Sequence, residues 1–246
     1  MKYLEALGIR PGHDVAHRNF ADPKQFEPER FFDDARTLLT KATPIILDKV
    51  APKLEEYPGR WNPGGFMVFP LGLTDDDSSL RLHVSAAGMP RDILCGPFIH
   101  NHGWHLASRI LAGNYSDTIF QLEMQHPSTQ VDPETNVWRR YETRRNPGGR
   151  DDLITDGTVV KAVPVLNREI PAGNFHTIEA VTVYHIPTTP PEQLAATLVL
   201  DSPAFVGTTY VLLDNSAGTP MERQRRELER DNIELAKEQL KNTAGF

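Results

Sequence analysis

Cysteine is almost missing from this 246-residue chain, which holds only Cys95. A single thiol cannot form an internal disulfide, so a disulfide-stapled scaffold is excluded and a cytoplasmic location is expected. Basic charge is also in deficit, because 26 Lys and Arg residues stand against 33 Asp and Glu residues, for a net charge of −7. A nucleic-acid partner, which requires a basic face, is therefore not expected.

Long apolar runs are absent as well. No stretch approaches the roughly 18 to 20 apolar residues that a membrane helix needs. Charge and proline occur too early in residues 1–14 for a signal peptide, so no membrane partner is expected. The composition, 39% hydrophobic and 24% charged, is typical of a globular protein. The length fits one large domain or a small domain with extensions.

Helical periodicity is confined to the two ends of the chain. Apolar residues recur at three- and four-residue spacing from Pro28 to Tyr57, with Pro44 expected to interrupt the run. A charged helix is expected over residues 220–242, with an apolar stripe at seven-residue spacing. Such a stripe is typical of a helix that packs on its own domain or pairs two subunits as a homodimer, and both alternatives stay open.

Between these ends the sequence predicts short β-strands separated by Gly, Pro, Asn and Asp. This rhythm is typical of an antiparallel sandwich or barrel. We therefore expect an all-β fold divided into an N-terminal helical extension (1–65), a β-barrel (66–214) and a C-terminal helix (215–246). The expected strands are 66–73, 80–86, 97–102, 105–113, 115–123, 136–143, 158–166, 175–183, 195–201 and 208–214.

The histidines are the informative part of the sequence. His100 and His102 are two residues apart on an expected strand, so both side chains point to the same side. Far downstream, the turn 171–174 precedes His176, which opens another strand. In a barrel whose strands cross at this end, a third imidazole would meet the first pair from the opposite wall.

In this region the chain resembles the cupin superfamily. The matching residues, in order, are Gly96, His100, His102, Gly113, Pro171, Gly173 and His176. The resemblance covers about residues 66–214 and implies a double-stranded β-helix, or jelly-roll barrel. It also implies that His100, His102 and His176 bind one divalent metal ion.

The acidic ligand of the superfamily is missing, because Leu106 and Ala107 stand where it would fall. A site of three neutral histidines resembles that of the cysteine-dioxygenase-like thiol dioxygenases, which implies Fe²⁺, although Zn²⁺ also binds three histidines. His105 lies three residues beyond His102, so strand alternation turns it away and we expect no ligand there.

Several hallmarks of that branch are absent. Leu106 replaces its cross-linking cysteine, and no arginine stands at 67–69 to bind a substrate carboxylate. The late-strand relay of the family would fall on Thr197, Val199 and Asp201. Other candidates around the site are Arg60 and Arg109 for an anion, Tyr115 and Tyr184 for the pocket, and Asn101, Asn174, Thr177 and Glu179 for orienting the imidazoles.

The function expected from this pattern is that of a non-haem iron(II) dioxygenase. Its partners would be a small anionic or thiol-containing metabolite and dioxygen, since three neutral ligands leave the metal charge uncompensated. The alternative is a zinc- or other metal-dependent cupin lyase or isomerase, or a small-molecule-binding cupin without a redox role.

Overall fold

The predicted all-β jelly-roll with N-terminal helices and a C-terminal helix is confirmed. The computed structural model describes residues 2–10, 26–89, 99–146, 150–205, 208–215, 218–219, 221–224 and 226–243. Cys95, Gly96 and Pro220 lie outside these residues. The strands form two antiparallel sheets, one of six strands and one of seven. None of the described helices is long and apolar enough to span a bilayer.

The first sheet has the strand order β1-β2-β3-β11-β5-β9. Its central strand β11 pairs with β3 on one side and β5 on the other. All seven residues of β11 are buried, so this strand forms the centre of the sheet. The strands are β1 (Arg60–Asn62), β2 (Phe66–Leu73), β3 (Ser79–Ser85), β5 (Leu106–Ala112), β9 (Phe175–Ile178) and β11 (Ala195–Asp201).

The second sheet has the order β13-β8-β6-β10-β4-β12-β7, and an additional β8–β7 pairing joins six of these strands in a closed cycle. Strand β8 makes this closure possible because its first half pairs with β7 and its second half with β6. The strands are β4 (Ile99–His100), β6 (Asn114–Gln125), β7 (Val137–Asn146), β8 (Arg150–Pro171), β10 (Tyr184–Thr188), β12 (Thr209–Leu213) and β13 (Met221–Gln224).

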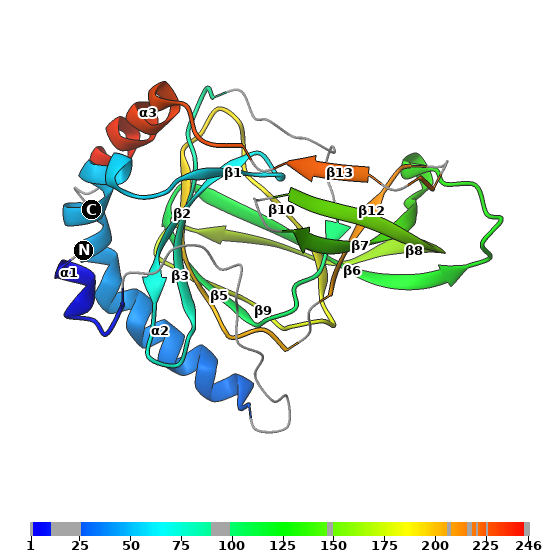
Figure 1. Ribbon diagram of the computed structural model, residues 1–246, viewed down its shortest axis with the longest axis horizontal. Coiled ribbons are helices and arrows are strands. Elements are labelled where there is room, and N and C mark those ends of the chain that lie inside the picture. Colours follow the sequence, from blue (N-terminus) through cyan, green and yellow to red (C-terminus); the bar gives the residue numbers. More distant parts are fainter. Residues whose placement is uncertain are drawn as a thin grey trace.

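The helices cover one face of the first sheet. Figure 1 shows α1, α2 and α3 together on the side of β2 and β3, whereas β6, β7 and β8 lie on the far side. Buried residues of α2 at helical spacing pack with strand residues in the main hydrophobic core. The helices are α1 (Lys2–Glu5), α2 (Pro28–Ile45), the π-helix η2 (Ile46–Val50), the 3₁₀ helices η3 (Ala51–Glu56) and η4 (Pro133–Thr135), and α3 (Arg230–Lys241).

The two faces of the first sheet differ in chemistry. On β3 and β11, one set of alternating residues joins the helix-packed core: Leu80, Leu82, Val84, Ala196, Leu198 and Leu200. The intervening residues point to the other face, which we call the inner face because it meets the second sheet. The inner face carries polar side chains: Arg81, His83, Thr197, Asp201, and His176 on β9.

Several predicted boundaries differ from the structure. Pro44 lies inside α2, and the helix is followed by a π-helical turn instead of stopping there. The C-terminal helix begins at Arg230, while Met221–Gln224 pairs as strand β13 with β8. The chain after the turn at 180–182 forms an unpredicted strand, β10. Strand β1 was also missed, and it lies within residues 1–65, where a helical extension was expected.

Gly113 occupies the turn between β5 and β6 for a steric reason. Its φ is +72°, in the region that favours glycine, and a Cβ atom there would clash with the carbonyl oxygen of Leu194. The hairpin expected at Gly113 and Asn114 is not formed, because β5 pairs with β11 and β9 whereas β6 pairs with β8 and β10. The tight turn at Gly113 instead leads directly from the first sheet into the second.

Candidate metal centre

Three histidines converge from neighbouring segments of the second sheet. His185 on β10 stands directly opposite His100 on β4 in the strand register, and His102 follows two residues after His100. One ring nitrogen from each of these histidines lies within 4.8 Å of the others. The ring centroids are 4.9 Å apart for His100 and His102, and 4.7 Å apart for His100 and His185. The group has the ligand types of a three-histidine metal site.

Asp117 fixes which nitrogen of His185 faces this group. His185 Nδ1 lies 2.7 Å from Asp117 Oδ1, and the Asp117 carboxylate is fully buried. An ionised carboxylate can only accept, so Nδ1–H donates and Nε2 retains a lone pair. His185 Nε2 in turn lies 3.0 Å from His102 Nε2. At that distance a proton or a cation must lie between the two nitrogens, which fits a shared metal ion.

The same carboxylate joins the two sheets. Asp117 Oδ2 accepts from His176 Nε2 at 2.8 Å and from Arg168 Nη2 at 3.0 Å. Burial raises the pKa of Asp117, but the hydrogen bonds from His176 and His185 lower it by more. The pKa of Asp117 is therefore well below its ordinary value. Burial also lowers the pKa of His176, which outweighs the raising effect of Asp117. Asp117 is therefore anionic and His176 neutral near pH 7.

His176, one of the three predicted ligands, lies beside the histidine group and is engaged with Asp117. Its ring centroid is 6.3 Å from that of His185, and it projects from β9 of the first sheet. Its Nδ1 is buried without a hydrogen-bond partner, and its ring lies 5.1 Å from the ring of Tyr115. The structure thus brings His100 and His102 together with His185, and His176 lies beside this group.

Sequence reasoning missed His185 because it missed strand β10. The expected strand 175–183 covers β9 and a turn, and it ends one residue before β10. A signal was present, because Tyr184 and Ile186 flank His185 in an alternating pattern that leaves one polar residue on the opposite face. Asp117 was missed in the same way, as a charged residue inside an otherwise strand-like run.

The other predicted site residues take varied positions. His105 lies outside the group: its ring stacks on Phe26 at 5.2 Å, and its Nδ1 accepts from the Ala180 N–H. Arg109 lies 5.4 Å from the Phe175 ring centre, on the helix-covered side of β5. Arg60 lies on β1, opposite Val68.

The residues expected to orient the imidazoles do so only in part. Asn101 Nδ2 donates to Val181 O at 2.9 Å, and its Oδ1 accepts from Tyr210 N at 2.7 Å, so it fixes the segment between His100 and His102. Asn174 and Glu179 are exposed. Tyr184 packs in an apolar cluster with Ile99, on the face of β10 opposite His185.

The inner face of the first sheet approaches this group through Trp104. The Trp104 ring lies 5.3 Å from the His102 ring, and its Nε1–H donates to Asp201 Oδ1 at 3.0 Å. Asp201 also pairs with Arg81 at 2.6 Å, and the two side chains are 1% and 12% exposed. The cation at Arg81 therefore offsets the negative charge that Asp201 places on the inner face.

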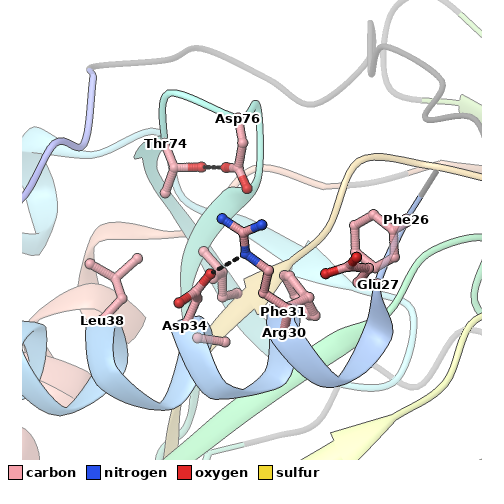
Figure 2. A pocket seen from close by; sticks show the side chains of 10 residues that line it. Phe26, Glu27, Arg30, Phe31, Asp34, Leu38, Thr74 and Asp76 are labelled. Atoms are coloured by element: carbon pink, nitrogen blue, oxygen red, sulfur yellow. Dashed lines mark hydrogen bonds and ion pairs between the residues drawn. The ribbon is translucent and has the colours of Figure 1, made fainter.

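A separate cleft of about 420 Å³ lies at the N-terminal end of α2. Figure 2 shows its charged rim, where Arg30 pairs with Asp34 and the turn residues Thr74 and Asp76 face them. Leu200, which also lines the cleft, belongs to the helix-packed core. The cleft and the histidine group therefore lie on opposite faces of the first sheet.

Comparison with known proteins gives only distant likenesses. No family model and no curated protein sequence matches the chain. A Drosophila melanogaster CENP-C structure bound to CAL1 is 9% identical, with 69% of this chain and 98% of that chain covered and a TM-score of 0.33. A Ralstonia eutropha protein of unknown function with a cupin-like fold is 12% identical over 73% of this chain and 72% of that chain, with a TM-score of 0.28.

A third similar structure is Pac13, a nucleoside dehydratase from Streptomyces. It is 14% identical, with 73% of this chain and 92% of that chain covered and a TM-score of 0.27. TM-scores this low mark a remote likeness. What the structure shows is two antiparallel sheets and a three-histidine group able to hold a metal ion.

Proposed function

We propose that this protein is a metal-dependent enzyme whose divalent ion is bound by His100, His102 and His185. The observation that carries the proposal is the convergence of these three ring nitrogens within 4.8 Å. His185 replaces His176 in the proposed ligand set because the group whose ring nitrogens lie within 4.8 Å of one another contains His185 and not His176. The Nε2 atoms of His102 and His185 lie 3.0 Å apart, a separation that two ligands of one metal ion can adopt.

The metal we propose is iron(II), and the reaction is a dioxygenation. His102 Nε2 and His185 Nε2 are 3.0 Å apart. If each binds the same metal ion at about 2.0–2.1 Å, the N–metal–N angle is about 90–97°, which is nearer to the octahedral than to the tetrahedral value. Three neutral imidazoles leave the charge of the ion uncompensated, which favours an anionic substrate. Iron(II) bound there would supply the electron-transfer chemistry that dioxygen requires. A cytoplasmic location stays a prediction from the sequence.

The substrate we propose is small and anionic or thiol-containing. Its binding surface would be the inner face beside Trp104, where the Arg81–Asp201 ion pair is held. Because Asp201 is paired with Arg81, a second carboxylate would meet less repulsion than Asp201 alone would impose. The residues that bind and orient it would thus come from the first sheet, and the metal ligands from the second.

Metal analysis of purified variants tests the ligand set. We expect one ion per chain in the wild type, its loss in His100→Ala, His102→Ala and His185→Ala, and retention in His176→Ala. Far-UV circular dichroism checks that each variant is folded. Retention in His185→Ala together with loss in His176→Ala would restore the ligand set expected from the sequence.

Oxygen consumption tests the reaction. Iron-loaded wild type is assayed against a panel of small thiols and carboxylates, with zinc-loaded protein as the control. We expect uptake only with iron, in a fixed ratio to product formed. A protein that binds one metal ion but consumes no oxygen with any member of the panel would contradict the dioxygenase and favour a lyase or isomerase.

A further inference from the structure

We propose that Asp117 is the positioning residue of the metal centre, since one buried carboxylate sets the tautomer of His185 and links it to His176 in the facing sheet. The inference rests on the proposed metal site and adds a residue that lies outside the ligand set. Asp117 is on β6, next to β10, and its side chain is fully buried between the sheets.

The two carboxylate oxygens of Asp117 accept hydrogen bonds from different donors. Among the described residues, Oδ1 accepts only from His185, at 2.7 Å. Oδ2 accepts from His176 at 2.8 Å and from Arg168 at 3.0 Å. Arg168 stands opposite Asp117 in the β6–β8 register, so the guanidinium reaches the carboxylate from the adjacent strand. Three donors thus converge on one carboxylate, and each oxygen has a distinct partner set.

The hydrogen bond to Oδ1 determines which ring nitrogen of His185 is free to bind a metal ion. A neutral imidazole carries one proton, and the nitrogen with the better acceptor keeps it. With Asp117 Oδ1 holding the proton on Nδ1, the Nε2 lone pair of His185 points into the histidine group. Without that acceptor, a proton on Nε2 would satisfy the nearby His102 Nε2 and block metal binding. Carboxylates that orient ligand histidines are typically worth 10- to 100-fold in metal affinity.

Asp117→Asn separates this role from simple packing. The amide has nearly the shape of the carboxylate but only one acceptor oxygen, so it can accept at the Oδ1 position or at the Oδ2 position but not at both. We expect that oxygen to occupy the Oδ2 position, because His176 and Arg168 both donate there. The NH₂ group then faces His185 Nδ1, which must lose its proton to accept, and His185 switches to the Nε2–H tautomer.

Nitrogen-15 NMR of the histidine side chains in metal-free protein reads this directly. In the wild type we expect Nδ1–H on His185 and Nε2–H on His176, and in Asp117→Asn we expect His185 to switch. Asp156→Asn is the matched control, because Asp156 pairs with Arg140 on the same sheet and has no histidine partner in that contact. It should change neither tautomer.

Metal titration completes the test. We expect Asp117→Asn to bind the metal about 10- to 100-fold more weakly, and Asp156→Asn to bind as the wild type does. Wild-type tautomers for both histidines in Asp117→Asn, or unchanged affinity, would overturn the positioning role. A wild type with the expected tautomers that binds no metal would instead contradict the proposed function. Thermal midpoints of metal-free protein identify variants that are merely unfolded.

Discussion

Leu82 and His83 are neighbours on β3, yet they serve opposite faces of the same sheet. Leu82 is fully buried in the helix-packed core, between Phe69 and Leu198 on the adjacent strands. His83 points to the inner face, beside Phe66, and its Nε2 is buried without a hydrogen-bond partner. The helix-covered face is apolar throughout its centre, whereas the inner face accepts buried polar groups that cost free energy.

This difference indicates that the helix-covered face stabilises the fold, whereas the inner face holds the polar groups that chemistry requires. Burying an apolar side chain stabilises the fold, but a buried polar atom without a partner costs about 1–3 kcal/mol. In the first sheet, His83 Nε2 and His176 Nδ1 are atoms of this kind, and both lie on the inner face. The inner face is also the one that reaches the histidine group through Trp104 and His176. The following substitutions test how independent the two faces are.

Leu82→Ala should have the largest effect. It leaves a cavity in the fully buried helix-packed core, which typically costs about 2–5 kcal/mol of unfolding free energy. Urea denaturation measures this loss. Metal bound per folded chain should stay at the wild-type value, because Leu82 faces the helices. A loss of metal in folded Leu82→Ala would show that the faces are coupled.

Arg81→Met should have the next largest effect. It removes the cation that pairs with Asp201 and leaves a carboxylate 1% exposed without that partner. Breaking a buried pair costs several kcal/mol, and we expect about 2–4 kcal/mol because Arg81 retains some exposure. Urea denaturation of Arg81→Met and of the double variant Arg81→Met/Asp201→Asn provides the comparison. The double variant should recover much of the loss, and no recovery would contradict the charge argument.

His83 should make the fold sensitive to acid. Burial, followed by the charge of Arg81, lowers its pKa from 6.5 to about 3. Between pH 6.5 and about pH 3, His83 is therefore protonated in the unfolded chain but not in the folded chain. Its contribution to stability is full above about pH 6.5 and declines as the pH falls towards 3. The slope from this group is at most about 1.4 kcal/mol per pH unit.

His83→Gln separates this contribution from general acid unfolding. Unfolding free energies of the variant and the wild type are measured by urea denaturation between pH 7 and pH 4. The difference between them should narrow or reverse as the pH falls, since glutamine takes up no proton. A difference that stays constant over this range would show that His83 does not titrate on unfolding.

Ile110→Val should have the smallest effect. Ile110 is 1% exposed on the inner face, opposite Thr197. Removing one methylene should cost about 0.5–1.5 kcal/mol, as in other cores. Thermal unfolding measures it, with metal content as the second readout. A cost near zero would indicate that the inner face is less closely packed than the helix-covered one.

Much of the fold was predictable because strand and turn chemistry are local. Strands β2 and β11 were predicted at their observed bounds, and Gly113 marked the turn that ends β5. The convergence of His100 and His102 also followed from spacing alone. Their third partner did not, because the register that sets His185 against His100 joins strands far apart in sequence. Nor does any local pattern reveal that His176 and His185 share one carboxylate.

The two-residue strand β4 has a consequence for how the chain matures. It is held between β10 and β12, both of which come from the last third of the sequence. Pairings between such distant segments form late and slowly. A nascent chain that has passed His100 and His102 still lacks both flanking strands, so metal capture must await nearly complete synthesis. Truncation before β12 should therefore leave two histidines without a scaffold to align them.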